Sequence, residues 1–270
     1  MSDYENDHFF EPATEECQDD RRPRAFGGII GQDHIVPRLR QSLRNGGLPQ
    51  LLAFVGPSGS GKTSLATVSA RAGKCRHARD LGDCCGTCPI CQLRDLNGLP
   101  SYHEWTGAEL EQQPTWWMRE GPGILDRPGY TLFIDEAQDL SKLRQKALFR
   151  QLERARANVI LATTHKHEIV DALLNRFGAN VFEVRRPSLQ QAVGLMWRLC
   201  ERLDVRADEE HLARAAQHYA LDLRKCVDFV YSARGQAPDR NVNDEFLRSV
   251  LGVACDDAQL SRVTSRPLAL

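Results

Sequence analysis

The sequence is poor in aromatic residues and has no uninterrupted apolar segment of membrane-spanning length. Only 7% of its 270 residues are aromatic, and no run reaches the roughly 18 apolar residues that a transmembrane helix needs. The acidic N-terminus also lacks the apolar stretch of a signal peptide. We therefore expect a cytoplasmic protein that does not contact a membrane.

The sequence also lacks an excess of either charge. Its 35 Lys and Arg residues nearly balance its 36 Asp and Glu residues, which excludes a basic field over the whole protein as a means of holding nucleic acid. The hydrophobic fraction of 41% is ordinary for a globular chain. The nine cysteines, in a cytoplasmic chain, are typical of thiols or metal ligands rather than of disulfides.

Short apolar runs alternate with helical patterns in the first two thirds of the chain. We predict strands from the runs at residues 51–55, 131–135, 158–164 and 181–186. Strands that alternate with helices over short links indicate an α/β fold with a parallel, doubly wound sheet.

The pattern changes at both ends of this α/β part. Residues 1–22 are acidic and aperiodic, which predicts a disordered tail. The α/β core is expected over 23–186, a small all-helical domain over 187–255, and a second tail over 256–270.

The segment GPSGSGKT (56–63) matches G-x-x-x-x-G-K-[ST] between a predicted strand and a predicted helix. Its glycines let backbone N–H groups turn toward phosphates, and the following helix start adds a positive field. Lys62 would reach the β- and γ-phosphates, and the Thr63 hydroxyl would coordinate Mg²⁺. A Gly/Ser turn that happens to fit is the alternative. The predicted ATP-binding residues are Gly56, Pro57, Ser58, Gly59, Ser60, Gly61, Lys62, Thr63 and Ser64.

Two further strand ends carry polar groups suited to nucleotide hydrolysis. The run LFIDEA (132–137) places Asp135 at the Mg²⁺ water shell and Glu136 as general base for the attacking water. At the end of LATT (161–164), Thr164 would hold the attacking water or the γ-phosphate. Its alternative role is to cap the next segment.

Residues 73–100 are rich in Cys, Gly and Pro and contain a metal-ligand spacing. Three cysteines two residues apart, with Cys75 as a fourth, form a closed structural zinc arrangement. Cys84 competes with Cys85 for a place in it, and His77 is a spare donor. A redox CxxC motif and reduced buried thiols are the alternatives. The predicted zinc ligands are Cys75, Cys85, Cys88 and Cys91.

Four segments together resemble the AAA+ ATPase module of clamp loaders, most closely the gamma/tau subunits of bacterial DNA polymerase III. In order they read FGGIIGQDHIVPRLRQSL, GPSGSGKTSLA, IDEAQDLS and VILATTHKHEIVDALLNRF. The resemblance spans roughly residues 24–235 and implies a five-stranded parallel sheet, a helical lid behind it, and ATP bound between them. It also implies adenine contacts at Ile30, Gly31 and Val36.

The same resemblance assigns roles to two arginines and supports the zinc module. Arg176 in LLNRF would reach the ATP of a neighbouring subunit, with Asn175 and Phe177 replacing the Ser and Cys of that motif. Arg224 in ALDLRKCVDFV would touch the γ-phosphate from the lid. The family carries a zinc module in this place, and CGTCPIC reproduces its C-G-x-C-x-x-C pattern, which favours Cys85 over Cys84.

The expected function is an ATP-hydrolysing subunit of a sliding-clamp loader in DNA replication. Its expected partners are other clamp-loader subunits in a ring, the sliding clamp, and primed-template DNA contacted mainly at phosphates. The tail after the helical domain is too short for the collar domain usual in the family, so we expect these 270 residues to lack it, and QLSRV (259–263) only partly resembles clamp-binding peptides. The alternatives are a stand-alone or mobile-element AAA+ ATPase that remodels another DNA-processing complex, and an ATP-binding scaffold or adaptor.

Overall fold

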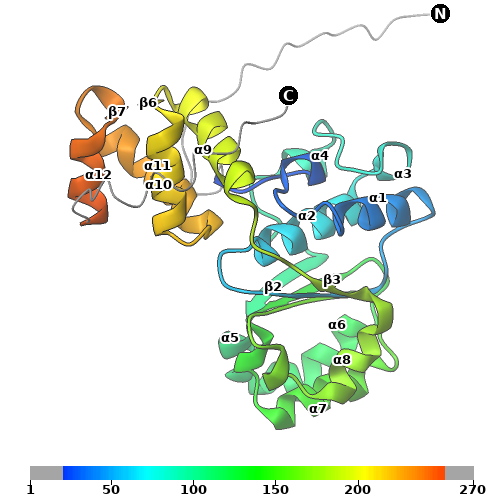
Figure 1. Ribbon diagram of the computed structural model, residues 1–270. Coiled ribbons are helices and arrows are strands. Elements are labelled where there is room, and N and C mark those ends of the chain that lie inside the picture. Colours follow the sequence, from blue (N-terminus) through cyan, green and yellow to red (C-terminus); the bar gives the residue numbers. More distant parts are fainter. Residues whose placement is uncertain (1–20, 253–270) are drawn as a thin grey trace, which may run out of the picture.

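The computed structural model describes residues 21–252 and shows an α/β core with a separate helical lid above it (Figure 1). The acidic tail predicted for residues 1–22 lies, apart from its last two residues, outside the described residues. The tail predicted for 256–270 and the QLSRV segment also lie outside them.

Five parallel strands form the sheet of the core, in the order β2-β3-β4-β1-β5. They are β1 (Leu51–Val55), β2 (Tyr102–Thr106), β3 (Thr131–Asp135), β4 (Asn158–Thr163) and β5 (Val181–Glu183). The predicted parallel five-stranded sheet is thus confirmed. The last predicted strand ends three residues earlier than expected, and β2 lies where no strand was predicted.

Strand side chains alternate between two apolar cores, one on each face of the sheet. Phe54 and Phe133 face α1 (Val36–Arg44) and α2 (Lys62–Lys74). The other face is covered by four helices (Figure 1). These are α5 (Gly107–Glu111), α6 (Gly121–Leu125), α7 (Lys142–Leu152) and α8 (Asp171–Phe177). Coverage on both faces explains the continuous apolar runs of β1, β3 and β4.

Helix starts in the core and the lid are fixed by side-chain caps. Thr106 and Glu109 form a capping box at α5, and Ser141 accepts the Arg144 N–H at α7. In the lid, Ser188 and Gln191 form a second capping box. Each cap satisfies backbone N–H groups that the helix itself leaves unpaired.

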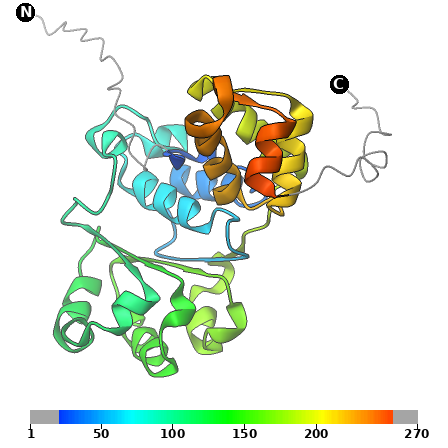
Figure 2. The same cartoon turned by 90° about the vertical axis from the view of Figure 1, so that its left-hand side faces the viewer.

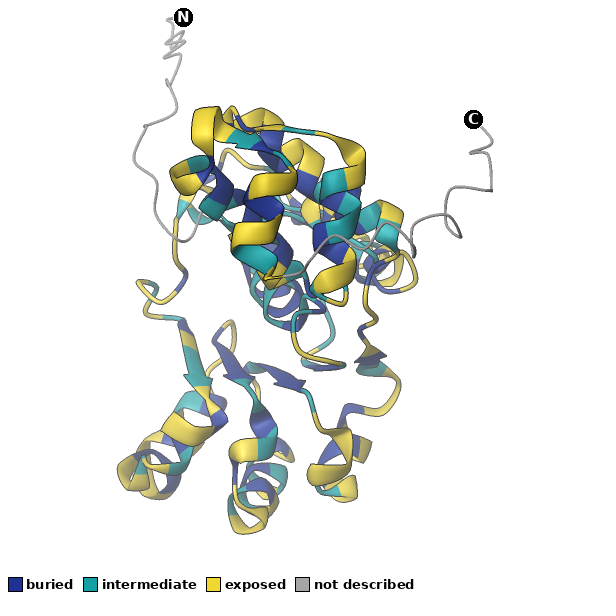
Figure 3. Cartoon of the chain, turned by 60° about the vertical axis from the view of Figure 1, so that its left-hand side comes forward, coloured by how far each residue is buried: buried dark blue, intermediate teal, exposed yellow. Residues whose placement is uncertain are grey.

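The lid has an apolar core of its own, with Met196, Leu212, Phe229 and Phe246 at its centre. Buried faces of its helices point at one another, while their outer faces are exposed (Figure 3). The helices are α9 (Leu189–Leu203), α10 (Glu209–His218), α11 (Leu223–Gln236) and α12 (Asp244–Leu251). Figure 2 shows this unit standing over one end of the core.

The lid is not wholly helical, contrary to the prediction. β6 (Arg206–Ala207) and β7 (Asn241–Val242) form a small parallel pair that joins two of its loops. Strands of two residues produce no periodicity in a sequence, so the pattern after Pro187 could not reveal them. The exact domain bounds stay predictions.

Short helices complete the described chain. Between α2 and β2 lie α3 (Ala78–Leu81) and α4 (Pro89–Gln92), which carry the cysteine-rich segment. The remaining ones are η2 (Phe26–Gly28), η3 (Trp116–Glu120), η4 (Ala137–Asp139), η5 (Lys166–Glu168), η6 (Gly178–Asn180) and η7 (Pro238–Arg240). Among residues 21–252, no helix combines the length and the apolar character that crossing a membrane requires.

Candidate nucleotide site and cysteine cluster

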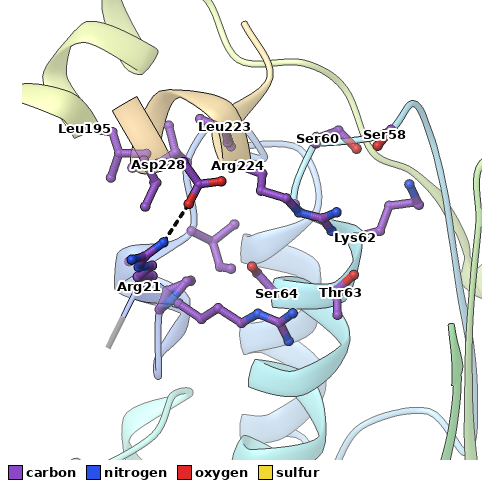
Figure 4. Close-up of a pocket in the computed structure, with 18 of the residues that line it drawn as sticks. Arg21, Ser58, Ser60, Lys62, Thr63, Ser64, Leu195, Leu223, Arg224 and Asp228 are labelled. Atoms are coloured by element: carbon purple, nitrogen blue, oxygen red, sulfur yellow. Dashed lines mark hydrogen bonds and ion pairs between the residues drawn. The ribbon is translucent and has the colours of Figure 1, made fainter. Parts of the chain in front are cut away.

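A cavity of about 780 Å³ lies between the core and the lid. The core contributes the loop before α2 and its first residues, Ser58 to Ser64, and the lid contributes residues of α9 and α11. In the close-up of Figure 4, Arg224 extends from the lid toward Lys62, and Leu195 lies near Asp228 on the other side of the cavity. Any occupant of this cavity therefore contacts both parts of the chain.

The backbone of the GPSGSGKT loop depends on its glycines. Gly59 and Gly61 have φ angles of +69° and +98°, a left-handed region that other residues enter only with strain. A Cβ at Gly56 would lie 2.1 Å from the Val184 carbonyl oxygen. No side chain caps the start of α2, so its first N–H groups are available to an anion.

Lys62 is buried at the start of α2, with 4% of its surface exposed. Its Nζ donates to the Pro57 carbonyl at 3.1 Å. Burial lowers the pKa of this ammonium, an effect that Glu136 and Asp135 oppose and Arg224 reinforces. A buried cation with one such hydrogen bond is suited to receive a phosphate oxygen.

Thr63 and Asp135 meet although they come from different elements. The Thr63 Oγ1 donates to Asp135 Oδ2 at 2.7 Å, because the end of β3 lies beside the start of α2. A hydroxyl and a carboxylate are the oxygen ligands that Mg²⁺ takes in nucleotide sites. The pair therefore fits the predicted Mg²⁺ position.

Glu136 follows β3 directly and lines the cavity. Its backbone is left-handed, with φ 46° and ψ 52°, which is uncommon for a residue with a Cβ. Its Oε2 accepts hydrogen bonds from Thr164 Oγ1 at 3.0 Å and from Gln138 Nε2 at 2.8 Å. Thr164 thus contacts the carboxylate of the predicted base, while its predicted contact with water or phosphate stays a prediction.

The remaining predicted ATP contacts separate into two groups. Ile30 and Arg224 line the cavity. Gly31 packs on Pro187, whose Cα would lie 2.9 Å from a Cβ there, and Val36, the first residue of α1, is buried in the core. Within residues 21–252, neither of these two is among the cavity-lining residues.

Arg176 lies on α8, which covers the opposite face of the sheet from α2. Its Nη2 donates to the Leu152 carbonyl at 3.5 Å, and the side chain is exposed. Arg176 is not among the described residues that line the cavity. The structure therefore does not bring it to the nucleotide site of its own chain.

Several residues that line the cavity belong to no sequence motif and were not predicted. Arg21 pairs with Asp228 of α11 at 2.8 Å (Figure 4) and stacks 4.2 Å above the Tyr231 ring. Glu104 of β2 accepts the Tyr102 hydroxyl at 2.9 Å, and burial raises its pKa. Segments distant in sequence supply these residues, so a local pattern could not identify them. Further unpredicted lining residues are Arg22, Arg94, Asp95, Asn97 and Val227.

Four cysteine sulfurs gather beside α2, all within 4.8 Å of one another. They belong to Cys75, Cys85, Cys88 and Cys91, and Cys84 is not among them. The 85–91 and 75–88 pairs are 3.9 and 4.0 Å apart. Tetrahedral Zn–S bonds of about 2.3 Å place sulfurs about 3.8 Å apart, so the donor set fits a zinc ion.

Hydrogen bonds and burial act differently on the thiols of this cluster. The Thr87 hydroxyl and the Cys88 N–H, at 3.5 and 3.2 Å, lower the pKa of Cys85 to about 5. Burial raises the pKa of Cys91 to about 12. Metal binding requires each thiol to be deprotonated, which the lowered pKa of Cys85 favours and the raised pKa of Cys91 opposes.

A buried arginine ties the cysteine segment to α2. Arg71, with 2% of its surface exposed, donates through Nη1 to the carbonyls of Ile90 at 2.8 Å and Leu93 at 2.6 Å. Arg94 and Asp95 follow at once and line the cavity. The segment that carries the cysteines thus also forms one wall of the nucleotide site.

Comparison with known proteins agrees with this geometry. The model of the AAA family, ATPases associated with various cellular activities, matches residues 52–185. The tau subunit of DNA polymerase III from Bacillus subtilis is 28% identical over 79% of this chain and 39% of its own length. The replication factor C small subunit of Methanothermobacter thermautotrophicus is 24% identical over 78% of this chain and 61% of its own. The chain therefore spans about two fifths of that tau subunit.

Among solved structures, the RuvB Holliday junction branch migration motor of Thermotoga maritima is similar. It has a TM-score of 0.60 and 20% identity, over 85% of this chain and 71% of that one. At this identity the likeness concerns the fold alone. Residues 52–185 thus match the AAA family of ATPases, and over most of its length the chain is similar to a DNA polymerase III tau subunit and a replication factor C small subunit.

Proposed function

We propose that the chain is an ATP-hydrolysing subunit of a DNA sliding-clamp loader. The observation that carries the proposal is that Lys62, Thr63 and Glu136 line one cavity between core and lid, with Asp135 hydrogen-bonded to Thr63. The similarity to tau and replication factor C subunits supports the clamp-loader part of the proposal.

Each residue of the cavity has a distinct part in the proposed reaction. The loop N–H groups and Lys62 bind the phosphates of ATP, and Arg224 approaches them from the lid. Thr63 and Asp135 hold Mg²⁺, which neutralises charge on the β- and γ-phosphates. Glu136 accepts the proton of the water that attacks the γ-phosphorus.

The assembly belongs to the same proposal. Arg176 lies outside the cavity of its own chain, which suits a residue that reaches the ATP of a neighbouring subunit. The proposed partners are other clamp-loader subunits in a ring, the sliding clamp and primed-template DNA. A replication assembly of this kind places the chain in the cytoplasm.

We also propose that Cys75, Cys85, Cys88 and Cys91 hold a structural Zn²⁺ ion. The observation that supports it is the mutual approach of their four sulfurs. Four protein ligands leave no open position, so the ion would stabilise the segment rather than act on a substrate.

The test combines ATP turnover with clamp-loading partners. We expect the purified chain to hydrolyse ATP, Lys62→Ala to abolish turnover, and the sliding clamp, primed DNA and partner subunits to stimulate it. Turnover that these additions leave unchanged would favour a stand-alone AAA+ ATPase of another DNA process. Binding of ATP without turnover would favour a scaffold or adaptor.

A further inference from the structure

Gln138 links the predicted general base to the neighbouring strand. It lies in η4, two residues after Glu136, and its Nε2 donates to Glu136 Oε2 at 2.8 Å. Its Oε1 accepts the Thr163 hydroxyl at 2.6 Å and the Thr164 N–H at 3.3 Å. One side chain thus joins the residue after β3 to the end of β4.

The hydrogen bonds on Glu136 are asymmetric. Both side-chain donors, from Gln138 and Thr164, approach Oε2, and the described structure gives Oε1 no such partner. The Glu136 N–H is fixed on Asp135 Oδ1 at 2.9 Å. Backbone and Oε2 are therefore held, and Oε1 is the oxygen available to accept a proton.

The amide is the chemical group that this position requires. It presents an N–H donor to Glu136 and a C=O acceptor to β4 at the same time. A carboxylate here would oppose the charge of Glu136, and an alkyl group would leave the Thr163 hydroxyl and the Thr164 N–H without their acceptor.

We propose that Gln138 is a positioning residue that aims Oε1 of Glu136 at the attacking water. This inference rests on the proposed ATPase function. As the water oxygen bonds to the γ-phosphorus, its proton passes to Oε1 and the bond to the departing ADP oxygen breaks. Gln138 acts through Glu136, so it affects turnover and leaves the phosphate-binding contacts intact.

The test is Gln138→Leu, which keeps the side-chain size and removes its hydrogen bonds. We expect kcat for ATP to fall about tenfold to a hundredfold, the scale of a displaced general base. The Kd for a non-hydrolysable ATP analogue should change less than about twofold. A kcat within about twofold of wild type, or a loss of analogue affinity that matches the loss of turnover, would overturn the proposal.

Gln145 provides a matched control. It is fully buried, whereas Gln138 is half-buried, and its amide joins the Leu140 carbonyl to the Val170 N–H away from the cavity. Both variants are assayed below their measured melting temperatures. We expect Gln145→Leu to lower the melting temperature without reducing kcat of the folded protein, and an equal kcat loss in both variants would overturn the proposal.

The Glu136→Gln background separates positioning from packing. If Gln138 acts through Glu136, adding Gln138→Leu to Glu136→Gln lowers the residual turnover less than about twofold. The same fold-loss in both backgrounds would overturn the positioning role. Absence of ATP hydrolysis by the wild-type chain would instead contradict the proposed function, and the Gln138 inference with it.

Discussion

Gly59 is the point where the phosphate loop touches the lid. A Cβ there would lie 2.0 to 2.2 Å from the atoms of the Asp222 carboxyl group. Asp222 caps α11 by accepting the Lys225 N–H at 3.1 Å, and the Leu223 N–H donates to the Gly59 carbonyl at 2.9 Å. Glycine is needed here both for its positive φ and for this close approach.

We predict that Gly59→Ala weakens ATP binding at least about tenfold, because the loop or the start of α11 must move to admit the methyl group. Titration with a fluorescent ATP analogue measures the change. Gly129→Ala is the control, since Gly129 has a similar φ of +77° with nothing within 4 Å; it bears only the backbone strain of about 1–2 kcal/mol. Equal ATP affinities of the two variants would contradict the prediction.

Lys62, which we propose binds the phosphates, lowers the stability of the folded chain. Burial lowers its pKa from 10.5, so between the lowered value and 10.5 the unfolded chain binds more protons than the folded one. The free energy of unfolding therefore rises with pH through this window, and at neutral pH the buried ammonium is destabilising.

We predict that Lys62→Met has a melting temperature equal to or above that of wild type at pH 7.5, without nucleotide. The difference should shrink as the pH rises toward 10.5. Turnover of ATP should fall at least about a hundredfold, because the cation that meets the phosphates is lost. Calorimetry over a pH series measures the first effect, and a variant less stable than wild type at pH 7.5 would contradict it.

At the scale of elements, burial decided what the sequence could predict. β1 and β3 occupy the predicted residues, because strands covered on both faces read as uninterrupted apolar runs. β2 is an edge strand paired with β3 alone, and its sequence YHEWT includes polar and exposed positions. The sequence of β2 therefore could not be distinguished from the Cys-rich segment that precedes it.

The residues of the candidate site also fall into a group that the sequence predicted and a group that it did not. Lys62, Thr63, Asp135 and Glu136 belong to contiguous motifs that follow or end strands. Lys62, Thr63 and Glu136 line the cavity, and Asp135 accepts the Thr63 hydroxyl, while their roles in hydrolysis stay predictions. Arg21, Glu104 and Asp228 reach the cavity only through the packing of distant segments, so no local pattern marked them.

The adjacent residues Cys84 and Cys85 allow a direct comparison of zinc binding. We predict that Cys85→Ser lowers the zinc content of the purified protein by at least half, because its sulfur belongs to the four-sulfur cluster. Cys84→Ser should keep about one zinc ion per chain, since its sulfur lies outside the cluster. Atomic absorption on the two variants measures the contents, and equal loss in both would contradict the assignment of Cys85.

At the scale of the whole molecule, the position of Arg176 predicts dependence on assembly. Because this residue lies away from its own cavity, we expect Arg176→Ala to leave the ATP affinity of the isolated chain within about twofold of wild type. In the assembled loader the same variant should lose at least about tenfold of the turnover, as expected for an arginine acting on a neighbour's nucleotide. Unchanged turnover in the assembly would contradict this role.

The cavity draws its walls from chain segments that are far apart, and the Arg21–Asp228 pair alone joins residues 207 positions apart. A ligand bound there contacts segments from nearly the whole described chain at once, and these contacts are lost when the ligand leaves. At a hundred times its Kd, such a ligand adds about 2.7 kcal/mol to the free energy of unfolding. Each round of hydrolysis and release would then remove the contacts that join core and lid. The two would alternate between moving as one rigid body and moving separately about the segment that connects them.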